Sequence, residues 1–333
     1  MAGSEATSRR PDPLTLVERM RTGDRLALAR LITHVENRTP AVPAIMKAIH
    51  GLGGDAFVIG ITGPPGAGKS TVVDRLVALL RARGQTVGVV AVDPSSPFTG
   101  GAVLGDRIRM QAHVLDTGVF IRSMATRGAV GGVARATGNV IKLLAAFGFP
   151  WVLIETVGVG QTELDIMKLA DTTVVVLVPE SGDAIQTMKA GLMEVADVFV
   201  VNKADRAGAP ALMAELKFAV HLAYTSPGTV RDIDWEIPVL AAEAQNDVGI
   251  AELFDAIARH RETLTATGAL SERRRARRHN ELRALLVEEF TARVDDGLRA
   301  GELATTFQRV ADGEMDPYSA AQAVLAVLSL RPS

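Results

Sequence analysis

Residues 63–70 read Gly-Pro-Pro-Gly-Ala-Gly-Lys-Ser, and this stretch decides the fold class. Its spacing, G-x-x-x-x-G-K-S, is that of the P-loop, whose backbone N–H groups surround nucleotide phosphates. The apolar run Val58–Thr62 precedes it and a helical stretch, Thr71–Arg83, follows it, which is the context that the motif requires. We predict that Lys69 contacts the β- and γ-phosphates and that Ser70 holds Mg²⁺. The predicted nucleotide contacts of this loop are Gly63, Pro64, Pro65, Gly66, Ala67, Gly68, Lys69, Ser70 and Thr71.

A second motif, N-K-x-D, is formed by Asn202-Lys203-Ala204-Asp205 directly after the apolar run Val198–Val201. The carboxyl ends of strands are where parallel sheets bind ligands. The Asp205 carboxylate can accept hydrogen bonds from guanine N1–H and N2–H₂, which adenine does not offer in that geometry. Lys203 is expected to lie along the base and Asn202 to brace the loop. The motif therefore predicts a guanine nucleotide, GTP or GDP, and the alternative is a plain strand-capping turn.

A third loop follows the predicted strand Pro238–Ala241. It consists of Glu243, Ala244 and Gln245, and we expect it to contact the nucleotide as well. The same residues are equally compatible with an ordinary connection from a strand to a helix.

Three carboxylates are candidates for metal binding and catalysis beside Ser70. Asp93 and Glu155 each end a predicted strand, and Asp106 lies in a glycine-rich segment. Mg²⁺ prefers oxygen ligands, commonly one or two carboxylates beside phosphates and water. Gln161 follows Glu155 closely and is a candidate for positioning the attacking water, as in other GTPases. The residues do not decide which carboxylate binds metal and which orients water.

The rest of the chain predicts an α/β fold with a mainly parallel sheet flanked by helices. Seven short apolar runs alternate with helical stretches, a pattern typical of βαβ units. These runs are Phe57–Thr62, Val87–Val92, Val119–Ile121, Val152–Glu155, Val174–Val178, Val198–Val201 and Pro238–Ala241. We expect an N-terminal helical extension over residues 1–55, a P-loop domain over 56–262 and a C-terminal helical arm over 263–333.

Local signals mark helices in both extensions. Asp24 is a predicted N-cap in the first, and Asp316 precedes Pro317 at the start of the last helix. The body of that helix, Ala320–Leu330, is apolar on nearly every side, so we expect it to be buried. An apolar stripe with a spacing of four precedes it, formed by Leu282, Leu286, Phe290, Val294 and Leu298. The arginine run over residues 273–278 is interpreted as a solvated helix face.

Composition limits the function classes. The 333 residues carry a net charge of −2, which favours neither nucleic acid nor an anionic membrane as a partner. There are no cysteines, so disulfides, thiolate metal sites and cysteine nucleophiles are excluded. The six histidines show no metal-ligand spacing. No apolar run is long enough to span a bilayer and residues 1–13 do not resemble a signal peptide, so a cytoplasmic protein is expected.

Several segments resemble the MeaB/ArgK family of SIMIBI-class P-loop GTPases, and the resemblance covers nearly the whole chain. The segments are Val92–Pro97, Gly105–Met110, Ile121–Gly128, Glu155–Gln161 and Lys189–Gly191. The resemblance implies a homodimeric GTPase chaperone of adenosylcobalamin-dependent acyl-CoA mutases, chiefly methylmalonyl-CoA mutase, with the C-terminal helices as the dimerisation arm. It also implies that Ser70, Asp93, Asp106 and Glu155 occupy Mg²⁺ and catalytic positions and that Gly182–Lys189 is a mobile switch. Glu243 departs from the family pattern, which tends to have serine there.

Two other functions remain open at this stage. One is an ATP-dependent kinase linked to amino-acid transport binding proteins, for which the P-loop would serve equally well while the N-K-x-D motif would be idle. The other is an interaction protein whose bound nucleotide is not hydrolysed.

Overall fold

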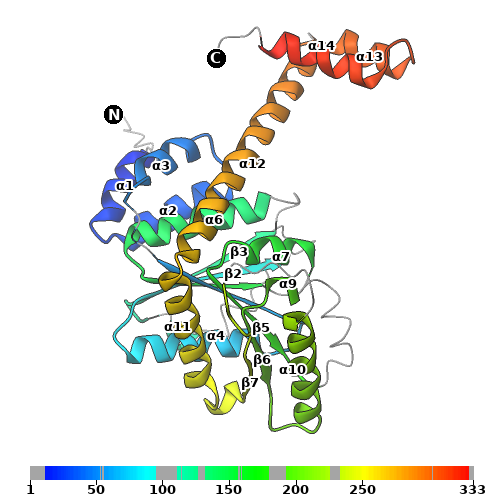
Figure 1. The fold of residues 1–333 in the computed structure, drawn as a ribbon. Helices are drawn as coiled ribbons and strands as arrows, with labels where there is room; N and C mark the ends of the chain where they lie inside the picture. Colours follow the sequence, from blue (N-terminus) through cyan, green and yellow to red (C-terminus); the bar gives the residue numbers. More distant parts are fainter. Residues whose placement is uncertain are drawn as a thin grey trace, which may run out of the picture. The chain divides into compact units, whose positions relative to one another are not determined.

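The computed structural model describes residues 12–52, 54, 56–94, 111–113, 115–126, 132–156, 158, 160–179, 193–225, 233–301 and 303–329. Its centre is a seven-stranded sheet in the order β3-β2-β4-β1-β5-β6-β7. All six pairings between these strands are parallel, as predicted (Figure 1). The strands are β1 (Phe57–Thr62), β2 (Val87–Pro94), β3 (Val119–Thr126), β4 (Trp151–Thr156), β5 (Thr172–Leu177), β6 (Val198–Asn202) and β7 (Val239–Ala242).

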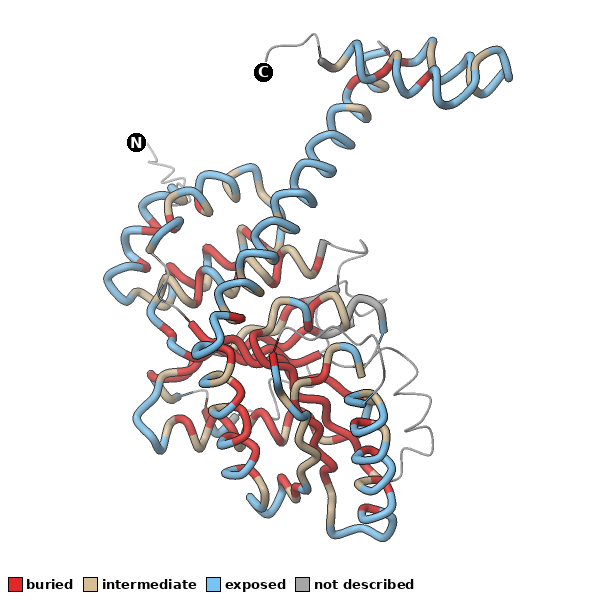
Figure 2. The backbone as a smooth tube through the Cα atoms, viewed as in Figure 1, coloured by how far each residue is buried: buried red, intermediate tan, exposed pale blue. Residues whose placement is uncertain are grey.

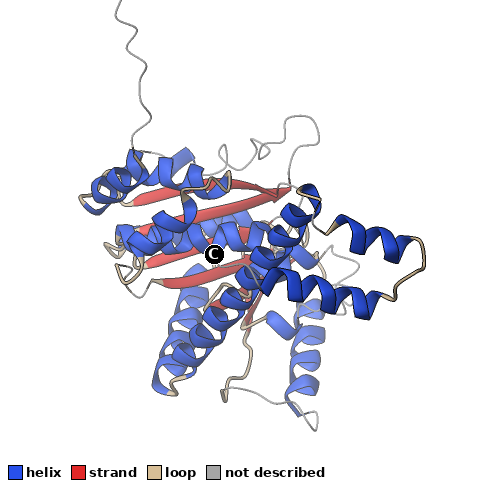
Figure 3. Cartoon of the chain, turned by 90° about the horizontal axis from the view of Figure 1, so that it is seen from above, coloured by secondary structure: helices blue, strands red, loops and turns tan. Residues whose placement is uncertain are grey.

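Helices cover both faces of the sheet because its central strands are buried on both sides (Figure 2, Figure 3). The first face packs against α4 (Lys69–Ala82) and α11 (Ile250–Ala266). The second packs against α6 (Gly132–Phe147), α7 (Gln161–Met167) and α10 (Ala209–Thr225). Short helical pieces complete the chain here: η1 (Gln111–His113), α9 (Met193–Val195) and η3 (Ala244–Asn246).

The N-terminal extension forms three helices that continue the second apolar core. These are α1 (Pro13–Arg21), α2 (Arg25–Glu36) and α3 (Val42–Ile49), and their inner residues join the cluster around α6. Asp24 caps α2 as predicted, since its carboxylate accepts hydrogen bonds from the N–H groups of Leu26 and Ala27. Arg122 on β3 pairs with Glu36 at the end of α2, which fastens the extension to the edge of the sheet.

The described chain divides into two compact units, one ending at Ser271 and the other starting at Glu272. The first unit includes all of α11, whose inner side stays buried as far as Leu264. The long helix α12 (Ala269–Arg299) runs from the first unit into the second, which also contains α13 (Ala304–Ala311) and α14 (Pro317–Ser329). In the part of the chain that the structure describes, no helix is both long and apolar enough to cross a membrane.

The last helix, α14, was predicted to be buried, and within a single chain this prediction is wrong. Asp316 does cap α14, but only Ala320 and Val324 among its described side chains are buried. Leu325 is 52% exposed, and Tyr318 is exposed as well. The physical reason is that α13 packs against one side of α14 and α12 only lines the cavity beside it, which leaves much of the apolar surface of α14 uncovered.

Candidate nucleotide site

The P-loop joins the central strand β1 to α4, so it lies at the carboxyl end of the sheet. Gly68 immediately precedes α4 with a φ of +84°, a backbone conformation that residues other than glycine rarely adopt. A Cβ at Gly68 would also lie 2.4 Å from Nδ2 of Asn202. Lys69 is buried, and its Nζ donates hydrogen bonds to the carbonyl oxygens of Gly63 (2.9 Å) and Pro64 (3.0 Å). The ammonium group is thus held over the loop, where a phosphate chain would meet it.

Ser70 and Glu155 meet directly. The Ser70 hydroxyl donates a 2.6 Å hydrogen bond to Oε1 of Glu155, and both residues are buried. Glu155 is brought there by the pairing of β1 with β4, in which it lies opposite Ile61 and faces α4. The serine and one of the predicted carboxylates therefore share one site.

This pair fits a magnesium ion. A hydroxyl and a carboxylate oxygen are hard donors of the kind that Mg²⁺ prefers. Within the described residues, no three His, Cys, Asp or Glu side chains come together to form a complete metal cage. The remaining ligands would then come from phosphate oxygens and water, which is how Mg²⁺ is commonly held beside nucleotides.

The N-K-x-D loop is tied to the P-loop by two of its side chains. Nδ2 of the buried Asn202 donates to the Ala67 carbonyl (2.9 Å), and Nζ of Lys203 donates to the Gly66 carbonyl (3.0 Å). Asp205, in contrast, is exposed. The two motifs, more than 130 positions apart in the sequence, thus lie against each other at one site, where the Asp205 carboxylate remains accessible.

The third loop lies against the same asparagine. The backbone N–H of Ala244 donates to Oδ1 of Asn202 (3.1 Å), so Asn202 connects the loops that follow β1, β6 and β7. Glu243 accepts a hydrogen bond from the Asn246 side chain, and Gln245 is exposed. The loop of Glu243, Ala244 and Gln245 is therefore located beside the P-loop and the N-K-x-D loop, and these three loops together are called the nucleotide site.

Three predicted site residues fall partly or wholly outside the described residues. Asp106 is outside them altogether. Asp93 lies in β2 and Gln161 is the first residue of α7, but their side chains are outside the described part. The predicted switch, 182–189, also lies outside the described residues.

Sequence reasoning gave no role to two buried threonines at this edge of the sheet. Thr62 and Thr156 end the adjacent strands β1 and β4, and both are 0% exposed. Thr156 donates to the Thr62 hydroxyl (2.9 Å), which donates to the Gly158 carbonyl (3.0 Å). The available signal was a polar residue at the carboxyl end of an otherwise apolar strand.

Comparison with known proteins agrees with this geometry. Residues 28–298 match the model of the family described as methylmalonyl Co-A mutase-associated GTPase MeaB. The chain belongs to the MeaB family. Like the proteins of that family, it is a P-loop GTPase that binds a guanine nucleotide.

Individual relatives cover almost the entire chain. It is 51% identical over 310 residues to a protein of Pyrococcus abyssi that is named as a GTPase, covering 93% of this chain and 95% of the relative. It is 33% identical over 282 residues to the mouse mitochondrial methylmalonic aciduria type A homolog, covering 83% of this chain and 66% of that protein. Among solved structures, the LAO/AO transport system kinase superimposes with a TM-score of 0.68 at 30% identity, covering 99% of this chain and 100% of that one.

Proposed function

We propose that this GTPase is a chaperone of an adenosylcobalamin-dependent acyl-CoA mutase, with methylmalonyl-CoA mutase as the most direct candidate. The observation that carries the proposal is the match of residues 28–298 to a family described by its association with that mutase. In this proposal GTP binding and hydrolysis gate the loading of the cobalamin cofactor and protect or reactivate the mutase. The nucleotide site would allow the protein to adopt two states, one with GTP bound and one with GDP bound after loss of the γ-phosphate.

The role of each residue at the nucleotide site follows from the chemistry of its side chain. Lys69 exchanges its contacts with the loop carbonyls for the β- and γ-phosphates of GTP. Asp205 accepts hydrogen bonds from the guanine edge, because its carboxylate is exposed at the loop that Asn202 holds. Ser70 and Glu155 would hold Mg²⁺, which neutralises charge on the β- and γ-phosphate oxygens. Asp93, Asp106 and Gln161 are proposed as metal or catalytic residues from their sequence positions alone.

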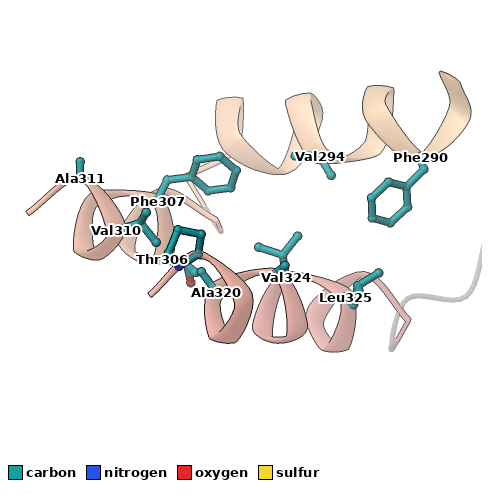
Figure 4. Close-up of a pocket in the computed structure, with 11 residues that line it drawn as sticks. Phe290, Val294, Thr306, Phe307, Val310, Ala311, Ala320, Val324 and Leu325 are labelled. Atoms are coloured by element: carbon teal, nitrogen blue, oxygen red, sulfur yellow. The ribbon is translucent and has the colours of Figure 1, made fainter. Parts of the chain in front are cut away.

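The second unit supports a homodimer. A cavity of about 520 Å³ opens between α12, α13 and α14, and its lining is almost entirely apolar (Figure 4). Among the described hydrophobic residues from Glu272 onward, only Leu303, Ala320 and Val324 are buried. So few buried side chains do not stabilise an independent unit of this size. We infer that the same face of a second copy covers this surface and completes a shared core.

The dimer is tested at the rim of that cavity. Phe307 and Leu325 are 44% and 52% exposed and come from two different helices, so Phe307→Asp with Leu325→Asp places two charges in the inferred interface. Light scattering should then give the mass of one chain in place of two. The matched double variant Phe218→Asp with Leu222→Asp, on the exposed side of α10 in the first unit, should remain dimeric. A wild-type protein that is itself monomeric would refute the inference.

A second candidate function is an ATP-dependent kinase linked to amino-acid transport binding proteins. It is favoured by the name of a solved structure that covers 99% of this chain, a transport system kinase. The contacts of Lys69 and Ser70 do not involve a base, so the choice of nucleotide depends on the N-K-x-D loop. Equal competition by ATP and GTP, with transfer of phosphate to such a binding protein, would favour the kinase.

The chaperone proposal is tested by measuring adenosylcobalamin loading onto purified methylmalonyl-CoA mutase in the presence of this protein. Loading should depend on GTP, and it should change when a non-hydrolysable GTP analogue replaces GTP. Loading that is indifferent to the protein and to the nucleotide would contradict the proposal. Lys69→Ala is the matched control, because it should remove the nucleotide dependence without altering the rest of the surface.

A further inference from the structure

The threonine pair at the ends of β1 and β4 forms a directional chain of hydrogen bonds. The Thr156 hydroxyl donates to Oγ1 of Thr62 at 2.9 Å, and the Thr62 hydroxyl donates to the Gly158 carbonyl at 3.0 Å. The Thr156 hydroxyl also lies 3.4 Å from the same carbonyl. Neighbouring hydrogen bonds in such a chain polarise one another, so the Thr62 hydroxyl is a better donor than an isolated one.

Packing alone does not account for hydroxyls at these positions. Both threonines are 0% exposed, and burying a hydroxyl is unfavourable unless it forms hydrogen bonds. Valine has nearly the same shape, favours strands and is buried within the neighbouring strands β5 and β6, for example at Val176 and Val200. The hydroxyls of Thr62 and Thr156 are therefore better explained by what they bind, the Gly158 backbone.

The alternation of side chains in β4 explains why this contact matters to the site. Glu155 faces α4 and binds Ser70, while the next residue, Thr156, faces the opposite side of the sheet, where α7 packs. On that side a Cβ at Gly60 would lie 2.7 Å from Sδ of Met167 in α7, so α7 lies unusually close to β1. Gly158 lies in the connection between β4 and α7, three residues before Gln161.

We propose that Thr62 and Thr156 are positioning residues that fix the Gly158 carbonyl in the connection between β4 and α7. The inference rests on the proposed role of that connection in GTP hydrolysis, and it does not depend on the mutase. Neither threonine needs to touch GTP. Their effect is to hold the loop in the geometry in which hydrolysis occurs, so their loss should lower kcat and leave nucleotide binding nearly unchanged.

The test compares GTP hydrolysis by the full chain with Thr62→Val and Thr62→Ser. Valine keeps the shape and removes the donor, and serine keeps the donor. Thr62→Val should lower kcat by roughly ten- to hundredfold, the usual effect of misplacing catalytic groups by about an ångström. KM and GDP affinity should change by less than about twofold, because the P-loop contacts are untouched. Thr62→Ser should restore most of kcat, and amide hydrogen exchange of the peptide containing Gly158 should accelerate in the valine variant only.

Two further variants keep the outcome clear. Thr156→Val removes only the first hydroxyl of the chain, so it should give a smaller loss of kcat, and it supplies the test if Thr62→Val folds poorly. Thr137→Val is the matched control, because Thr137 is equally buried and the hydrogen-bond partner of its hydroxyl among the described residues is a methionine sulfur at 3.9 Å. Its kcat should equal that of the wild type.

The proposal is overturned if Thr62→Val keeps the wild-type kcat, or if valine and serine lower it equally. Glu155→Gln separates this failure from a failure of the proposed site. Should Glu155→Gln lose turnover while Thr62→Val does not, only the positioning role is wrong. Should Glu155→Gln also hydrolyse GTP normally, the assigned role of the Ser70–Glu155 pair is wrong.

Discussion

Replacement of Asn202 by alanine tests whether this residue holds the loops of the nucleotide site together. The Asn202 side chain forms two buried hydrogen bonds, from Nδ2 to the Ala67 carbonyl at 2.9 Å and from the Ala244 N–H to Oδ1 at 3.1 Å. Ala67 and Ala244 are 0% and 1% exposed, so water does not readily replace the lost partner. A buried polar group without a partner costs about 1–3 kcal/mol, and Asn202→Ala leaves two such groups, so it should lower the free energy of unfolding by about 2–6 kcal/mol. For a unit of this size that corresponds to a fall of roughly 5–15 °C in Tm.

The assay is urea denaturation of wild type and variant, together with calorimetric titration of GDP. Asn246→Ala is the matched control: its exposed amide donates to Glu243 at 3.1 Å, and its loss should change the free energy of unfolding by less than about 0.5 kcal/mol. GDP affinity should fall in Asn202→Ala, because two of the three loops lose their common anchor, and stay unchanged in the control. Equal, small effects of the two substitutions would refute the idea that one asparagine holds these loops together.

Three other substitutions remove a charged side chain, two at the nucleotide site and one elsewhere in the first unit. Lys69→Ala should weaken GTP binding by about 3 kcal/mol, roughly a hundredfold, in a calorimetric titration, whereas the exposed Lys168→Ala should not. Asp205→Asn should weaken GTP and raise relative affinity for XTP in competition binding, and an unchanged preference for GTP would contradict the guanine assignment. Hydrogen bonds from Arg81 hold the pKa of Asp116 below its ordinary value of 3.8, so this pair stabilises the fold above that pH and loses its effect as pH falls towards the lowered pKa. Thermal melts of Asp116→Asn should therefore show a Tm deficit at pH 5–7 that shrinks below about pH 4, and a deficit independent of pH would be the contrary result.

The fold could be predicted from the sequence because the apolar runs, the helical stretches between them and the positions of the motifs all indicate the same architecture. Apolar runs buried on both faces require helices on both sides, and parallel pairing brings the carboxyl ends of the strands to one edge. The P-loop, Glu155 and Asn202 all lie at that edge. A contact between Ser70 and a carboxylate at the end of a strand was therefore expected. The N-caps Asp24 and Asp316 were predictable because a short polar side chain satisfies N–H groups that a helix leaves open.

Other features depend on tertiary contacts that a single sequence does not contain. The hydrogen bonds of Asn202 join three loops from distant parts of the chain, and sequence spacing carries no information on which carbonyl its amide meets. Thr62 and Thr156 appear as ordinary strand residues until the pairing of β1 with β4 brings their hydroxyls together. The burial of α14 was mispredicted because an apolar helix indicates that some surface covers it, but not whether that surface belongs to the same chain.

The proposed chaperone function is tested most directly by the rate of GTP hydrolysis by the full chain, measured with and without purified methylmalonyl-CoA mutase and with ATP as the control nucleotide. We expect GTP to be hydrolysed in preference to ATP, and we expect the mutase to raise the rate for GTP alone. Equal turnover of ATP and GTP, unaffected by the mutase, would contradict it.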